Sequence, residues 1–250
     1  MGVSSFLARF RRELPAQPRY VAAPKDHRVY VIGDIHGRLD LLRALHARID
    51  ADRATYPSAK TLEIYLGDYV DRGPASAGVI ECLVTRATQV AAVFLRGNHE
   101  AILQDFMDGT VAVEDWRPVG GAETLRSYGV KSSLMTDDAR RLLLAGMPET
   151  HRAFLSGLRN MFRLGPYLFV HAGIRPGVAI ERQAVNDLHW IRDEFLSHRG
   201  SFGYFVVHGH SPVMTAQFLP NRINIDTGAY MTGRLTCLRI APEGVDLLGD

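Results

Sequence analysis

Strand-like and helix-like segments alternate three times in the first part of the chain. Apolar runs cover residues 28–33, 61–66 and 90–95, and helical patterns follow them over residues 39–49, 74–87 and 99–107. A helix that joins two strands of one sheet imposes parallel pairing and a right-handed crossover. The pattern therefore predicts an α/β fold in which the first hundred residues form a parallel sheet covered on both faces, with ligands at the carboxyl ends of its strands.

The rest of the chain has a different pattern. Residues 108–160 lose the alternation and carry Trp116, the pair Gly120 and Gly121, and two helical stretches, so we expect a helical insertion there. From Met161 onward strand patterns dominate and predict a second, mixed or antiparallel sheet. Its expected strands cover residues 167–170, 204–207, 214–219, 222–225 and 235–240, with a helical stretch over residues 185–196. No linker divides residues 27–250, which we interpret as one domain.

Composition narrows the class of protein. In 250 residues, 46% hydrophobic and 22% charged side chains are typical of a globular chain, and no apolar run approaches 18 residues, the length of a membrane span. The start of the chain lacks the features of a secretory signal, so we expect a cytoplasmic protein. Cys82 and Cys237 lie in apolar patterns and are expected to be buried thiols rather than a disulfide, a zinc site or a nucleophile.

The positive charge is concentrated near the start of the chain. The net charge of +2 is too small to indicate a nucleic-acid-binding protein. Residues 1–26 form a basic arm, in which residues 1–25 carry Arg9, Arg11, Arg12, Arg19 and Lys25 against Glu13. Contact with an anionic membrane is one interpretation of this arm; its three prolines favour the other, a loosely ordered tail.

Polar clusters follow the first three predicted strands. They are Gly33-Asp34-Ile35-His36-Gly37, Gly67-Asp68-Tyr69-Val70-Asp71-Arg72-Gly73 and Gly97-Asn98-His99-Glu100. Any one of them could be a turn followed by a helix cap. Three in register place Asp34, His36, Asp68 and Asn98 along one sheet edge, where they could share metal ions.

Two later strands end in histidine. His171 is followed by Ala172-Gly173, and His208 by Gly209-His210-Ser211. Carboxylates, an amide oxygen and imidazoles without a thiolate suit Mn²⁺, Fe²⁺ or Zn²⁺ better than Ca²⁺. A carboxylate that bridges two such ions is the arrangement that hydrolyses phosphate esters.

These segments resemble the metallophosphoesterase superfamily, and within it the small bacterial and bacteriophage serine/threonine phosphatases of the PPP type. The resemblance rests on GDIHG, GDYVDRG, GNHE, HAG and the later GH, and extends from about Val29 to Ile240. It implies an α/β sandwich with two central β-sheets flanked by helices, so that residues 27–250 would be a single catalytic domain with a helical insertion around 108–160.

The resemblance also implies a ligand set. Asp34, His36 and Asp68 would hold one divalent ion, and Asp68, Asn98, His171 and His210 would hold the other, with Mn²⁺ the expected metal. His208 is the alternative to His210. Asp226 matches a segment near the site and is expected to orient a ligand. Pro212 stands where phosphodiesterases of the superfamily often carry a further histidine, which favours a phosphomonoesterase.

Substrate binding and proton transfer are implied for other residues. Arg72, Arg96 and Arg192 would bind the phosphoryl group, because guanidinium groups match its oxygens. His99, paired with Asp71, would protonate the leaving group after a hydroxide bridging the two ions attacks phosphorus.

We therefore expect a phosphoprotein or small phosphomonoester substrate, and most of all a serine/threonine protein phosphatase. The alternative is a symmetrical dinucleoside tetraphosphatase, which shares the HAGI sequence at residues 171–174 but usually departs from the Asp71-Arg72-Gly73 sequence found here. A third interpretation, a catalytically inactive scaffold that binds phosphorylated partners, is disfavoured by the intact set of ligands with His99 and Asp71.

Overall fold

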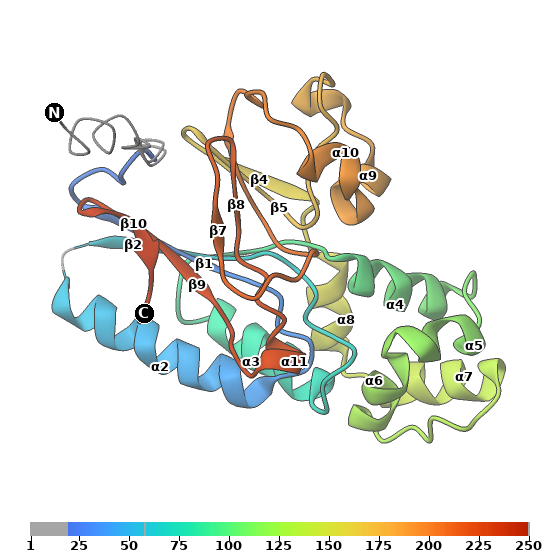
Figure 1. Ribbon diagram of the computed structural model, residues 1–250. Coiled ribbons are helices and arrows are strands. Elements are labelled where there is room, and N and C mark those ends of the chain that lie inside the picture. Colours follow the sequence, from blue (N-terminus) through green and yellow to red (C-terminus); the bar gives the residue numbers. More distant parts are fainter. Residues whose placement is uncertain (1–19, 58, 250) are drawn as a thin grey trace, which may run out of the picture.

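Two five-stranded β-sheets packed face to face form the centre of the protein (Figure 1). The structure is a computed structural model that describes residues 20–57 and 59–249. The first sheet, in the order β10-β9-β1-β2-β3, contains β1 (His27–Ile32), β2 (Lys60–Tyr65), β3 (Ala92–Phe94), β9 (Cys237–Ala241) and β10 (Gly244–Leu247). The second, in the order β4-β5-β6-β8-β7, contains β4 (Met161–Leu164), β5 (Tyr167–Val170), β6 (Phe205–His208), β7 (Gln217–Phe218) and β8 (Arg222–Asn224).

Helices cover the outer faces of this sandwich. Figure 1 shows α2 (Leu39–Thr55) and α3 (Ser76–Ala87) beneath the first sheet. On the outer face of the second sheet, α9 (Val185–Trp190) and α10 (Asp193–Leu196) pack against β5 and β6. The remaining helices are α4 (Asn98–Asp108), α5 (Val113–Trp116), η2 (Arg117–Val119), α6 (Gly121–Ser127), α7 (Thr136–Gly146), α8 (Glu149–Ser156), η3 (Ile180–Arg182) and α11 (Ala229–Thr232).

Strand β1 shows why its sequence is apolar at four consecutive positions, from Val29 to Ile32. Val29 and Val31 face the second sheet, whereas Tyr30 and Ile32 face α2 and α3. Successive side chains of a strand point to opposite faces, so a strand covered on both sides lacks polar alternation. The predicted fold class is confirmed, and the pairing of β1, β2 and β3 is parallel.

The last predicted strand belongs to the other sheet. We expected residues 235–240 in the second sheet, but β9 pairs antiparallel with β1 and extends the first sheet. Leu238 and Ile240 pack into the apolar layer between the two sheets. A strand of either sheet can bury apolar side chains in this layer. The apolar pattern therefore did not determine the partner, and it missed β10, which pairs with β9.

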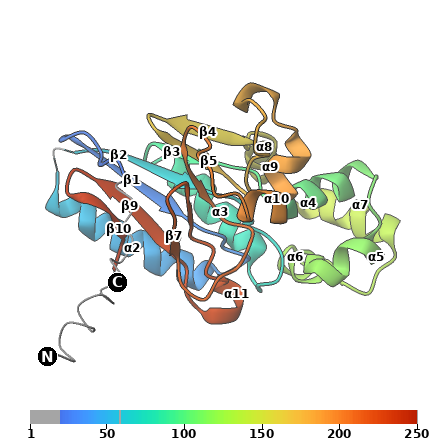
Figure 2. The same ribbon diagram turned by 45° about the horizontal axis from the view of Figure 1, so that its top comes forward.

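The predicted insertion is helical and stands beside the sandwich. Helices α5, α6, α7 and α8 lie within residues 108–160, and Figure 2 shows α4 to α7 together at one end of the sheets. Trp116 is completely buried there and packs against Phe106 of α4, with ring centroids 4.8 Å apart. The insertion thus has its own apolar contacts with the helix that begins at Asn98.

Most of the predicted basic arm, residues 1–19, lies outside the described residues. Its last part contacts both sheets: the Tyr20 hydroxyl donates to the Leu219 carbonyl (2.7 Å), and the Ala23 N–H donates to the Ala241 carbonyl (3.1 Å). No helix within residues 20–57 and 59–249 has the length and apolar character needed to cross a membrane.

Candidate active site

The predicted metal-binding residues come together at one end of the sandwich. Asp34, Asp68 and Asn98 follow β1, β2 and β3, while His171 and His210 follow β5 and β6 of the other sheet. The carboxyl ends of neighbouring parallel strands lie at the same edge, and the packing of the two sheets brings both edges together. All five side chains are buried.

The backbone of this site is strained. Five non-glycine residues of the described chain have positive φ, and all five belong to the predicted site: His36 (47°), Asp68 (52°), Asp71 (70°), Arg72 (66°) and His210 (64°). Each such conformation costs an L-residue roughly 1–3 kcal/mol and persists only where its surroundings impose it. The fold thus holds these side chains where an unstrained turn would not.

Glu100 is one of the residues that impose these turns. Its buried carboxylate accepts hydrogen bonds from the backbone N–H groups of Asp68 (2.8 Å), Tyr69 (2.7 Å), Val70 (3.2 Å) and Gly97 (3.0 Å). It therefore joins the turn after β2 to the turn after β3. Glu100 had no predicted role, although an acidic residue in the first turn of a helix is a recognisable capping signal.

Two histidine rings are oriented to present a free nitrogen. The Nδ1–H groups of His36 and His171 donate to the carbonyls of Val70 (2.9 Å) and Leu66 (3.0 Å). In each ring Nε2 then faces Asp68, at 3.3 Å from a carboxylate oxygen. A backbone acceptor at the other ring nitrogen is the usual support of a metal-binding histidine, because it selects the tautomer with a free lone pair.

The donor atoms form two overlapping groups. One contains His36, Asp68 and His99 and the other contains Asp68, His171 and His210, with the donor atoms of each within 4.8 Å of one another. Asp68 is common to both, which is the place of a bridging ligand. Asn98 joins the second group, since its Oδ1 lies 3.0 Å from His171 Nε2 and 2.8 Å from His210 Nδ1.

Asp34 shows that the site suits a cation. Its Oδ2 accepts the His210 N–H (3.0 Å), but its buried Oδ1 has no hydrogen-bond partner among the described residues. Burial and repulsion from Asp226 and Asp68 raise the pKa of Asp34 well above its usual range. A divalent ion would supply the missing partner and offset this repulsion. Together with the imidazoles and Asn98, these carboxylates fit a metal centre.

Of the two alternative histidines, His210 reaches the donor cluster. His208 instead contacts Phe195 edge-on, with centroids 4.9 Å apart, and its Nδ1 meets the Gly209 carbonyl at 3.0 Å. Burial lowers the pKa of both histidines to about 3, so both are neutral near pH 7. Asp226, expected to orient a ligand, lies beside Asp34 and accepts the Gly228 N–H (2.9 Å).

His99 and Asp71 form a buried pair. His99 Nδ1 lies 2.7 Å from Asp71 Oδ2, and His99 Nε2 lies 3.9 Å from Asp68 Oδ2. Burial opposes protonation of His99, but Asp68 and Asp71 outweigh it and raise the pKa of the imidazole. Two further donors to Asp71, Trp116 and Thr124, come from the helical insertion and have no counterpart in our sequence-based site.

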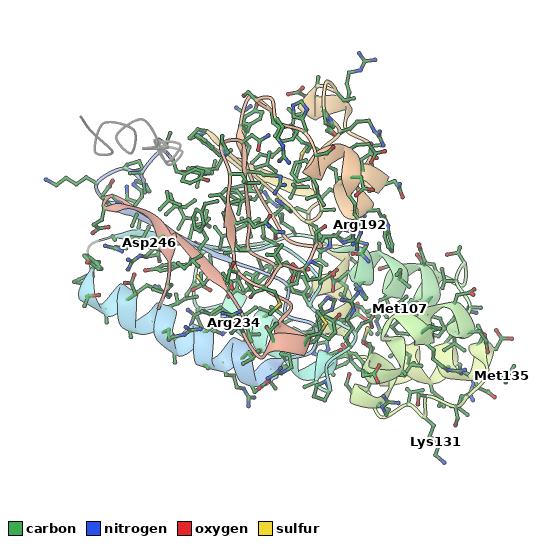
Figure 3. The ribbon with its side chains drawn as sticks, viewed as in Figure 1. Met107, Lys131, Met135, Arg192, Arg234 and Asp246 are labelled. Carbon is green, nitrogen blue, oxygen red and sulfur yellow. The ribbon has the colours of Figure 1, made fainter. Side chains whose placement is uncertain are left out.

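The three predicted phosphate-binding arginines have different surroundings. The Arg72 guanidinium lies over the Tyr230 ring, 4.7 Å from its centroid, and none of the described residues accepts a hydrogen bond from it. Arg192 is exposed at the start of α10, and its charge contributes to the lowered pKa of His210. Figure 3 shows Arg192 between the α9–α10 segment and α4. Arg72 and Arg192 therefore flank the cluster.

Arg96 is directed elsewhere. Its Nη2 donates to the Leu155 carbonyl (2.8 Å), and its side chain lines a hollow of about 350 Å³ with Asn160 and His189. Phosphate binding by Arg96 stays a prediction, because its guanidinium is partly occupied by the end of α8.

The cysteines do not contribute to this site. Cys237 is buried in β9 and Cys82 is partly buried in α3, and both are free thiols. Burial raises the pKa of each, which keeps the thiols protonated and unreactive.

The two-sheet fold, with carboxylate, amide and imidazole donors at the carboxyl ends of its strands, defines a metal-dependent phosphoesterase. The sequence profile of the calcineurin-like phosphoesterase family matches residues 27–246, and the chain belongs to this family. The family predicted from the sequence motifs is therefore confirmed.

Curated relatives cover most of this chain. The asymmetrical bis(5'-nucleosyl)-tetraphosphatase PrpE of Anoxybacillus flavithermus is 28% identical over 230 residues, which cover 84% of this chain and 89% of the relative. Serine/threonine-protein phosphatase 1 of Salmonella typhimurium is 30% identical over 219 residues, covering 85% and 91%. Both relatives are named as phosphatases, and the names differ in the substrate: a dinucleoside tetraphosphate in one and a phosphoprotein in the other.

A solved structure has the same fold. It is that of a candidate diadenosine tetraphosphatase, with a TM-score of 0.60 and 21% identity, and the match covers 93% of this chain and 97% of the other. At this identity the likeness concerns the fold alone.

Proposed function

We propose that this protein hydrolyses phosphate monoesters and acts on phosphoserine and phosphothreonine in proteins. The observation that carries this proposal is the buried pair of His99 and Asp71, with Nδ1 2.7 Å from the carboxylate and Nε2 facing the donor cluster. An alkoxide is a poor leaving group, so cleavage of a serine or threonine ester needs a proton donor in the transition state. Such a donor is less necessary for leaving groups that are already stable anions.

The donor set suits two divalent ions, with Mn²⁺ the expected metal. Asp34, His36 and Asp68 would hold one ion, and Asp68, Asn98, His171 and His210 the other. When bound, the ions would activate water and neutralise charge on the phosphoryl oxygens. We also propose that residues 27–250 act as one catalytic domain, because the ligands come from both sheets.

The other side chains have separate tasks in the proposed reaction. Arg72 and Arg192 donate hydrogen bonds to phosphoryl oxygens that carry no leaving group. Water adds its oxygen to phosphorus as the bond to the leaving oxygen breaks. The electron pair of that bond stays with the leaving oxygen, which takes a proton from His99 Nε2 and departs as the alcohol. The attacking water keeps one proton, as the hydroxyl of inorganic phosphate, and loses the other. That second proton replaces the one that His99 gave to the leaving oxygen, so His99 ends the reaction protonated again.

A second candidate function, hydrolysis of dinucleoside tetraphosphates, is favoured by two aromatic side chains beside the cluster. Trp190 is 41% exposed and meets His210 edge-on at 6.1 Å, and Tyr230 meets His36 at 5.2 Å. Aromatic rings stack on nucleobases with about 1–3 kcal/mol per base. The tetraphosphatase relative is named as asymmetrical, whereas the alternative expected from the sequence was a symmetrical tetraphosphatase.

A competition assay separates the two functions. With Mn²⁺ present, a phosphoserine peptide and diadenosine tetraphosphate are supplied together at equal concentration, and the products are separated by chromatography. Preferential release of phosphate from the peptide is expected. Preferential cleavage of the nucleotide would overturn the proposed substrate, and no turnover of these compounds or of p-nitrophenyl phosphate would favour the binding scaffold.

A further inference from the structure

The carboxylate of Asp71 is held from three sides. It is fully buried, and its Oδ2 accepts hydrogen bonds from His99 Nδ1 (2.7 Å) and from the Trp116 indole N–H (2.9 Å). Its Oδ1 accepts the Thr124 hydroxyl at 2.6 Å. Trp116 and Thr124 are 45 and 53 residues away in the sequence, in α5 and α6 of the helical insertion.

We infer that the insertion positions the proton donor, and that Trp116 and Thr124 are positioning residues that act through Asp71 on His99. Both donate to the carboxylate that holds His99 Nδ1, so they fix the orientation of Asp71 and, through it, the direction in which the His99 ring points. The inference rests on the proposed function, in which His99 protonates the leaving group.

The backbone beside these donors is built for close contact. The Arg72 N–H donates to the Gly120 carbonyl (3.3 Å), and a Cβ at Gly120 would lie 2.5 Å from that nitrogen. A Cβ at Gly121 would lie 2.3 Å from the Trp116 ring. Glycine at both positions leaves the room that the Arg72 backbone and the Trp116 ring occupy. Close contact with Arg72 and Trp116 therefore explains the adjacent glycines at positions 120 and 121.

Thr124 also supports the backbone of Asp71. The Asp71 N–H faces Thr124 Oγ1 at 2.9 Å and Ser76 Oγ at 3.0 Å, and these two hydroxyls lie 3.0 Å apart. Asp71 has a positive φ of 70°, so its peptide needs such partners to stay in place. Because Ser76 stays available as an acceptor, replacing the Thr124 hydroxyl removes the contact to the carboxylate without leaving this N–H unpaired.

The test measures how activity depends on the leaving group. Trp116→Phe and Thr124→Val each remove one donor to Asp71 and keep most of the side-chain volume. Kinetics are measured with phenyl phosphate and p-nitrophenyl phosphate, which share the phosphoryl group and differ in the basicity of the leaving phenolate. A general acid contributes roughly 10²- to 10⁴-fold, and we expect each variant to lose about tenfold more kcat/KM on phenyl phosphate than on p-nitrophenyl phosphate.

Controls separate positioning from folding. Thr136→Val lies in the same insertion and breaks contacts to Val113 and Glu114 but none to Asp71. It should therefore leave kcat/KM unchanged on both esters. Thr124→Ser keeps the hydroxyl and should therefore keep the wild-type ratio of kcat/KM on the two esters. Metal content and thermal midpoint are recorded for every variant.

Two results would overturn the inference: equal losses on both esters, or wild-type activity on both. A wild-type enzyme that cleaves both aryl esters but no phosphoserine peptide would contradict the proposed substrate instead, and the aryl pair would still decide the role of the insertion.

Discussion

Gly209→Ala tests whether Asp34 is a metal ligand, because it disturbs that side chain without changing it. Gly209 has an ordinary φ, so alanine introduces no strain of its own in the backbone. A Cβ at this position would lie 2.0 Å from Asp34 Oδ1 and 3.0 Å from its Cγ. The nearest atom is thus the same carboxylate oxygen that has no hydrogen-bond partner among the described residues.

The size of the effect follows from the distance. Cβ atoms rarely approach another heavy atom within 3.0 Å, so the carboxylate must move by about 1 Å. A displacement of this size in a catalytic site costs on the order of 100-fold in rate, or about 2.7 kcal/mol. We expect kcat/KM for p-nitrophenyl phosphate to fall by that factor, together with weakened binding of one of the two ions.

The assay compares metal content after dialysis, kcat/KM and the thermal midpoint. Gly146→Ala, at the end of α7, is the matched control, because its Cβ would meet only the Tyr128 carbonyl at 3.6 Å. It should retain both ions and full activity. Gly209→Ala protein with wild-type activity and two tightly bound ions would refute the placement of Asp34 in the metal centre.

Four further predictions concern other parts of the molecule. Asp68→Ala should lose both ions, since it serves both groups of donors, and elemental analysis that finds two bound ions would contradict the bridge. Arg192→Ala should keep both ions but lose about 1.5–3 kcal/mol of transition-state stabilisation, a 10- to 150-fold fall in kcat/KM; an unchanged value would place it outside the substrate site. Arg86→Met should lower the free energy of unfolding, measured by urea denaturation, by about 3–5 kcal/mol. The reason is that the buried Glu63 carboxylate loses the Arg86 guanidinium, which donates to its two oxygens at 2.6 and 3.0 Å. A loss below about 1 kcal/mol would refute this prediction. Burial lowers the pKa of His46 to about 4, below its unfolded value of 6.5. The unfolded state therefore takes up the proton first, and the free energy of unfolding should fall as the pH drops from 6.5 to 4. His46→Gln should show a shallower fall over the same pH range, and slopes identical to those of the wild type would contradict this prediction.

The placement of the metal donors was predictable because each motif is local. Asp34, Asp68 and Asn98 directly follow apolar strands that alternate with helices, and parallel strands end at one edge. No knowledge of side-chain packing is needed for that conclusion. The sequence favoured His210 and kept His208 as the alternative. His208 ends β6 and His210 stands two residues later, and the geometry shows that His210 joins the donor cluster whereas His208 contacts Phe195.

Contacts between distant segments were not predictable in the same way. Strand β9 pairs with β1 although more than 200 residues separate them, and its apolar residues would have suited either sheet. Arg96 adjoins a motif but donates to the end of α8, because its direction depends on a helix that is 59 residues away.

The sequence by itself determined which chemistry the chain can support: the identities of the donors, their positions at strand ends and the class of fold that gathers them. These follow from residue type and from local periodicity, which do not change when the chain folds. Only the tertiary structure decided how Asp71 is held, because Trp116 and Thr124 reach it across the insertion through contacts that no local pattern records. Orientation depends on which surfaces pack together, and packing is a property of the folded chain as a whole.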